Sequence, residues 1–110
     1  MIPVIDIVTD EVKTVNASDI AYVRRTGLNG SMINLVANNT EYRMLNNVEI
    51  LRYLNDQELL VKSDWSTYIN PTKVKKLDKE LLMAEFESGK QASVSKMHIN
   101  RIEKLLDKSE

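Results

Sequence analysis

Apolar and polar residues alternate in short segments along the first part of the chain. The apolar members are mostly Val, Ile and Tyr, the residue types that favour strands. Strands are therefore expected over Val4–Val8, Val12–Val15 and Asp19–Arg24, and Asp10-Glu11 is expected to turn between the first two. Segments of this length, repeated at short intervals, predict a chiefly β domain.

The clearest hairpin joins Ser31–Ala37 to Thr40–Met44. Asn38 and Asn39 stand between the two segments, and Asn tolerates the positive φ angles of a tight two-residue turn. Such a turn fixes the register and gives the hairpin one apolar face. The opposed pairs are expected to be Leu35 with Tyr42 and Ile33 with Met44.

Short strands and turns are also expected in the second half. A strand over Glu58–Ser63 leads into a loop over Asp64–Thr67. Asn70-Pro71 marks a turn, because Pro disfavours a helical conformation in the residue before it.

A second hairpin is predicted to join Leu81–Glu87 to Gln91–Ser95 around a three-residue loop, Ser88-Gly89-Lys90. This loop length is preferred because it places apolar groups on one face of the hairpin. It sets Phe86 near Ala92 and Ala84 near Val94, whereas a two-residue loop would pair Phe86 with Gln91.

Two helices are expected, each preceded by a residue whose side chain can cap it. The first follows Asn46 or Asn47 and ends near Leu54, and the second follows Ser95. Their apolar residues recur at helical spacing and are expected to be buried. These are Val48, Leu51 and Leu54 in the first helix, and Ile99, Ile102, Leu105 and Leu106 in the second.

Length and composition narrow the class of protein. The 110 residues suit one domain, 1–110, and 43% hydrophobic with 28% charged residues is ordinary for a soluble globular protein. Neither a membrane span nor a signal peptide is expected, which fits a cytoplasmic location. Because the chain has no Cys, disulfides, thiolate metal sites and cysteine nucleophiles are excluded.

No enzyme is expected. The carboxylates Glu80, Glu85 and Glu87 lie on or beside the second hairpin without a second convergent set. The sequence has no Gly-rich phosphate loop and no nucleophile elbow. We therefore predict no catalytic residue, no metal, no cofactor and no small-molecule substrate.

Charge argues mildly against nucleic-acid binding. The formal net charge is −1 and the pI about 5.9, whereas nucleic-acid-binding domains are usually basic. Binding would need basic residues gathered on one face. The Lys73, Lys75, Lys76 and Lys79 run is diluted by acidic neighbours, and such runs are usually a solvated face.

Three features each allow a DNA contact or a plainer role. Arg24 and Arg25 precede a flexible Thr26–Gly30 segment, which suits either a phosphate or an ordinary turn. Trp65, the only Trp, suits either a nucleic-acid surface or the core. His98, the only His, stands at the start of the last helix, where it can meet a phosphate or solvent.

The order of these elements resembles the LytTR family, the DNA-binding domains of bacterial response regulators. Asp19-Ile20-Ala21-Tyr22 is similar to the family's Asp-Ile-x-aromatic strand, and 60–70 to its Phe-x-Arg-x-His-Arg-Ser-Tyr-Ile-Val-Asn stretch. The segment 94–102 is similar to its Val-Ser-Arg-Arg-x-Leu-x-x-Leu ending. The likeness covers about residues 4 to 106.

The resemblance implies small stacked antiparallel β-sheets with one or two short helices and a C-terminal helix. It further implies that loops at one side of the domain contact double-stranded DNA at promoter direct repeats. These loops are Arg24–Ser31, Asp64–Thr67 and Ser95–His98. A homodimer or a receiver-domain partner is compatible with it, and so is a place in a longer regulator. The residues expected to contact DNA are Arg24, Arg25, Asn29, Ser31, Lys62, Trp65, Ser66, Lys96, His98 and Arg101.

The sequence departs from the family pattern at two of these loops. Asp64-Trp65-Ser66 replaces His-Arg-Ser, and Lys96-Met97 replaces Arg-Arg. Asp64 would repel phosphates unless it accepts a hydrogen bond from a cytosine amino group, and Met97 removes a guanine-binding Arg. An alternative therefore stays open: an interaction module that modulates a related regulator through sheet edges or the apolar side of its last helix.

Overall fold

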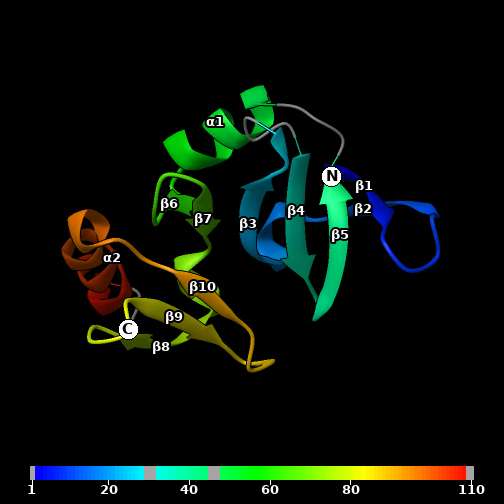
Figure 1. The fold of residues 1–110 in the computed structure, drawn as a ribbon. Helices are drawn as coiled ribbons and strands as arrows, with labels where there is room; N and C mark the ends of the chain where they lie inside the picture. Colours follow the sequence, from blue (N-terminus) through cyan, green and yellow to red (C-terminus); the bar gives the residue numbers. More distant parts are fainter. Residues whose placement is uncertain (1, 29–31, 45–47, 109–110) are drawn as a thin grey trace.

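Two antiparallel sheets and two helices form the described part of the protein, residues 2–28, 32–44 and 48–108 of a computed structural model (Figure 1). The larger sheet has the strand order β2-β1-β5-β4-β3-β7-β6, and the smaller has the order β10-β9-β8. This architecture confirms the expected mainly β class with a C-terminal helix.

The elements have the following bounds. The strands of the larger sheet are β1 (Ile2–Asp6), β2 (Val12–Val15), β3 (Ile20–Thr26), β4 (Met32–Ala37), β5 (Thr40–Met44), β6 (Val61–Lys62) and β7 (Thr67–Ile69). Those of the smaller sheet are β8 (Val74–Asp78), β9 (Met83–Phe86) and β10 (Gln91–Ser93). The helices are α1 (Val48–Asp56) and α2 (Lys96–Lys108), and short 3-10 turns span Ala17–Asp19 and Pro71–Lys73.

The β4–β5 hairpin has the predicted register. Leu35 lies opposite Tyr42, and Ile33 lies opposite Met44. Its two turn residues have φ angles of 51° and 65°, as a tight two-residue turn requires. Local turn chemistry and the alternation of apolar residues therefore specify the same pairing.

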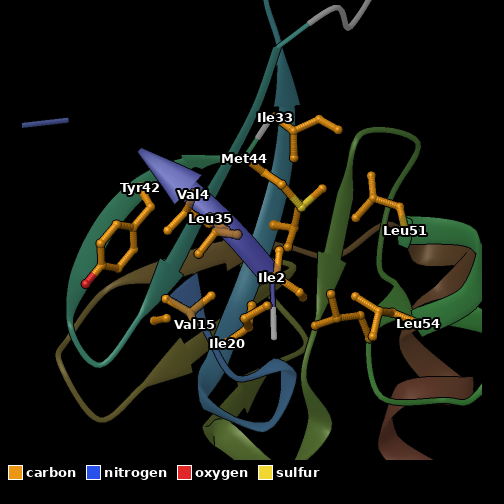
Figure 2. Packing of buried hydrophobic residues seen from close by; sticks show 13 residues of the cluster. Ile2, Val4, Val15, Ile20, Ile33, Leu35, Tyr42, Met44, Leu51 and Leu54 are labelled. Carbon is orange, nitrogen blue, oxygen red and sulfur yellow. The ribbon is translucent and has the colours of Figure 1, made fainter. Parts of the chain in front are cut away.

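A first core lies between one face of the larger sheet and α1 (Figure 2). Leu51 and Leu54 are 2% and 4% exposed, which confirms two members of the predicted helix stripe. The predicted cap residues Asn46 and Asn47 lie outside the described residues. The sheet contributes fully or nearly fully buried side chains, including Val4, Ile20, Val23, Ile33, Leu35 and Met44.

The predicted strand over Glu58–Ser63 is wrong for most of its length, because α1 ends there in a hydrogen-bonded cap. Glu58 has a φ of 59°, Leu59 N–H donates to Leu54 O at 3.0 Å, and Glu58 N–H donates to Asn55 O at 3.1 Å. This pattern is a Schellman motif built without the usual Gly. Only β6 remains to pair with β7.

Other strand limits also differ from prediction. β1 covers Ile2–Asp6 rather than Val4–Val8, because the Asp6 carboxylate accepts hydrogen bonds from the Val8 and Thr9 amides and turns the chain. β2 has the predicted bounds, and β3 extends two residues beyond Arg24.

The sequence pattern predicts no strand where β7 and β8 lie. β8 carries the exposed Lys75 and Lys76 at an edge of the smaller sheet, where charge discourages pairing with another chain. Lys79 pairs with the Glu103 carboxylate of α2. This lysine run is thus a solvated face with one structural ion pair.

The second hairpin has a three-residue loop, as predicted, but the loop lies one residue earlier. Ala92 pairs with Ala84, not with Phe86. The Phe86 N–H donates to Lys90 O at 3.0 Å, so the loop is 87–89. Its third position needs a left-handed conformation, and Gly89 supplies it with a φ of 83°. The predicted loop would have put Lys90 in that position.

A second core joins both sheets to α2. It gathers Val61 and Ile69 of the larger sheet with Ala84, Phe86 and Ala92 of the smaller one. The α2 stripe is confirmed, because Ile99 and Ile102 are 8% and 0% exposed and Leu105 and Leu106 are partly buried. The β6–β7 segment therefore belongs to the larger sheet by pairing and to the second core by packing.

Truncating Leu51 to Ala should lower the free energy of unfolding by about 2–5 kcal/mol, because it leaves a cavity under α1. Tyr53→Ala on the exposed side of the same helix should change it by about 0.5 kcal/mol or less. Urea unfolding followed by circular dichroism measures both. Equal effects of the two changes would contradict this account of α1 packing.

Candidate nucleic-acid interface

Asp64 closes the turn between β6 and β7. Its Oδ1 accepts hydrogen bonds from the Ser66 N–H at 2.8 Å and the Ser66 Oγ at 3.3 Å. Its Oδ2 accepts one from the Ser93 hydroxyl on β10. Both carboxylate oxygens are thus engaged inside the protein, which gives Asp64 a structural role in the turn.

These bonds favour the ionised carboxylate. Burial raises the pKa of Asp64, but the hydrogen bonds from Ser93 and Ser66 outweigh this effect and hold the pKa below its usual value. The turn is therefore held most firmly when Asp64 is charged.

Backbone hydrogen bonds join this turn to the two other segments expected to contact DNA. Arg25 N–H, in β3, donates to Ser66 O at 2.8 Å. Ser95 N–H, at the start of α2, donates to Ser63 O at 2.7 Å. The end of β3 and the start of α2 therefore each lie beside the β6–β7 turn.

A basic hollow of about 320 Å³ lies beside the turn, between the sheet and α1. Its cations are Arg25, Arg52 and Lys62, and its described lining holds no carboxylate. The remaining lining residues are Leu51, Asn55 and Tyr68. Among the described residues, Arg25 is one of the few with a buried polar atom, its Nε, that has no hydrogen-bond partner.

Two of these three cations are predicted from the sequence and one is not. Arg25 and Lys62 are expected from the resemblance, and the structure brings them to the same hollow. Arg52 is missed, because helical spacing shows only that it lies off the Leu51 and Leu54 stripe. Which part of the sheet faces Arg52 depends on how α1 docks, and no local sequence pattern carries that information.

Arg24 does not join Arg25. Successive residues of a strand point to opposite faces of the sheet, so the two guanidinium groups separate. The Arg24 guanidinium carbon lies 5.8 Å from the centre of the Tyr22 ring, on the face away from α1. The other two residues expected in this loop, Asn29 and Ser31, lie outside the described residues.

The start of α2 carries the last three predicted residues. Ser95 immediately precedes the helix, and its backbone carbonyl accepts the His98 and Ile99 amides, each at 3.1 Å. The Ser95 Oγ lies 2.6 Å from His98 Nδ1. Lys96 is exposed, and Arg101 has only a long contact with Glu58, 4.0 Å between Nη2 and Oε1.

Two large apolar side chains project from the adjoining segments. Trp65, on the β6–β7 turn, is 83% exposed, and Met97, in the first turn of α2, is 85% exposed. Of the two interpretations of the lone Trp, the structure shows the surface position. Ser66, beside it, is partly buried.

The protein is thus a mainly β domain with a hollow lined by three cations beside strands β6 and β7. The sequence model of the LytTr DNA-binding domain matches residues 10–107, so the chain belongs to this family of DNA-binding domains. A solved structure, the LytTr DNA-binding domain of a putative methyl-accepting/DNA response regulator from Bacillus cereus, has a similar fold, with a TM-score of 0.72 at 17% identity. The likeness covers 96% of this chain and 97% of that chain. No match was found among curated proteins.

Family membership indicates a DNA-binding regulator and not an enzyme family. Among the described residues, no group of three or more His, Asp or Glu side chains is placed to hold a metal ion. No helix in the described ranges is long and apolar enough to span a membrane.

The Asp64→Asn variant should lose part of the acid dependence of stability. A carboxyl whose pKa is lower in the folded than in the unfolded state stabilises the fold above its unfolded pKa, and this contribution disappears as pH falls through the folded value. Unfolding in urea from about pH 6 to about pH 2 should show wild type and variant converging at low pH.

Ser93→Ala is the companion variant, because it removes a donor to Asp64 without removing the carboxyl. It should shift the acid-sensitive range of stability upward in pH. Parallel pH profiles for wild type and Asp64→Asn would contradict the role assigned to this carboxylate.

Proposed function

We propose that this domain is a sequence-specific transcription regulator that binds duplex DNA along the edge formed by the end of β3, the β6–β7 turn and the start of α2. Family membership supports DNA as the ligand. The end of β3 and the start of α2 are both hydrogen-bonded to the β6–β7 segment, which supports a single contact face for DNA. In line with the family resemblance, two copies bind direct repeats in a promoter.

The basic hollow is the observation that carries this proposal. Its three cations line one space, where their positive charges would act together on a DNA phosphate. Phosphate neutralisation supplies most of the sequence-independent affinity of DNA-binding proteins. A net charge of −1 is compatible with this mechanism because the local field, not the total charge, acts on the phosphates.

The start of α2 supplies a second contact of the same kind. Anions are favoured near a helix N-terminus, where backbone N–H groups point outward. Lys96, His98 and Arg101 add side-chain donors there, and the long Arg101–Glu58 contact leaves the guanidinium available. A DNA phosphate at the start of α2 would meet these groups.

The alternative, an interaction module without DNA binding, has less support. One surface expected for it is the apolar side of the last helix, but Ile99 and Ile102 are buried in the second core. That side of α2 therefore faces its own domain.

A salt titration of binding to a random-sequence duplex tests the proposal. The logarithm of the binding constant should fall linearly with the logarithm of salt concentration. Replacing Arg25, Arg52 or Lys62 with Ala should weaken binding and reduce the slope by up to about 0.9 for each phosphate that is no longer neutralised. Fluorescence anisotropy of labelled DNA measures both quantities.

Lys75→Ala provides the matched control, because this exposed lysine lies on β8 of the smaller sheet, away from the hollow. It should leave the salt slope unchanged. Failure of the wild-type domain to bind any duplex at low salt, where the phosphate contribution is strongest, would rule out the proposed function.

A further inference from the structure

We propose that Trp65 and Met97 recognise thymine through its 5-methyl group, so that this domain selects bases by apolar contact. The inference rests on the proposed function and specifies how bases are chosen. Arg25, Arg52 and Lys62 contact phosphates in that account, and phosphates carry no sequence information directly. Selection of bases must therefore come from other side chains on the same edge.

Apart from Lys96 and Arg101, which are assigned to phosphates, polar side chains of the turn and of the start of α2 already bond to one another. The Asp64 oxygens accept hydrogen bonds from Ser66 and Ser93. The Ser95 Oγ pairs with His98 Nδ1. To bond to a base, these side chains would have to break the hydrogen bonds that they make within the protein. They are therefore poorly suited to reading base edges.

Trp65 and Met97 are apolar side chains that project outward. Each lies two residues beyond a member of the hydrogen-bonded pair Ser63 and Ser95, so both rise from segments whose backbones are joined. Single exposed apolar residues are normal on protein surfaces. These two are 83% and 85% exposed and stand on segments whose backbones are hydrogen-bonded to each other, on the edge assigned to DNA.

The chemistry of the DNA grooves indicates which group of a base exposed apolar side chains contact. In the major groove, thymine presents a methyl group, which apolar side chains contact, whereas guanine and cytosine present hydrogen-bonding groups. Met adapts its shape to a small apolar partner, and Trp offers a large, stiff face. The Asp64 hydrogen bonds fix the backbone of the turn that carries Trp65 before DNA binds, which limits the entropy cost of ordering that turn.

Replacing thymine with deoxyuridine removes only the methyl group and tests the inference directly. Duplexes are first selected from a random library with the wild-type domain, and each thymine is then replaced in turn. At one or more positions the replacement should weaken binding about fourfold, as expected for one buried methyl. Trp65→Ala or Met97→Ala should bind the thymine and deoxyuridine duplexes equally at those positions.

Leu81→Ala is the control, because Leu81 is 69% exposed and lies beside the smaller sheet. It should keep the wild-type preference for thymine. All three side chains are exposed, so the variants should fold. A wild-type domain indifferent to every deoxyuridine, or a preference that survives both Trp65→Ala and Met97→Ala, would overturn the inference.

The two proposals fail in different ways. If the domain binds and selects duplexes but ignores the methyl group, the apolar contact is wrong and DNA binding stands. If Trp65→Ala abolishes DNA bending while thymine and deoxyuridine bind alike, the indole acts as a wedge between bases and the methyl inference is again overturned. If no duplex binds at low salt, both proposals fall.

Discussion

The carboxylate of Asp64 holds together segments that the sequence keeps far apart. It accepts a hydrogen bond from Ser66 within its own turn and another from Ser93 on the smaller sheet. The backbone bonds from Arg25 to Ser66 and from Ser95 to Ser63 complete the junction. Because β6 and β7 also pack in the second core, this junction fixes how α2 sits against the larger sheet. The proposed DNA edge exists only where these contacts meet.

Local signals account for the parts of the fold that the sequence predicts well. The Asn38-Asn39 turn and its alternating neighbours specify the β4–β5 register, and helical spacing specifies the buried side of α2. The errors arise where a conformation is set by something other than residue type. Glu58 adopts a left-handed conformation that favours Gly, and the resulting helix cap removes most of an expected strand. The second hairpin differs, because there residue type does decide the loop: Gly89 supplies its left-handed third position and so shifts the loop by one residue.

The candidate site is less predictable because it depends on packing between elements. Two adjacent arginines in the sequence suggest one basic patch, but strand alternation sends Arg24 and Arg25 to opposite faces. Arg52 joins the basic hollow through the docking of α1, which no spacing reveals. Asp64 suggests repulsion of DNA in the sequence, and its bonding partners become visible only in three dimensions. The acidic balance of the chain is likewise uninformative until its cations are placed.

In the proposed complex, DNA lies over the edge that carries the β6–β7 turn. Trp65 is the only Trp in the chain and is 83% exposed, so its fluorescence reports on this turn alone. Acrylamide quenching of that fluorescence, measured without and with saturating duplex DNA at low salt, is the most direct test. We expect strong quenching in the free domain and clear protection in the complex. Unchanged quenching, under conditions where anisotropy shows the DNA to be bound, would place the DNA elsewhere and contradict the account.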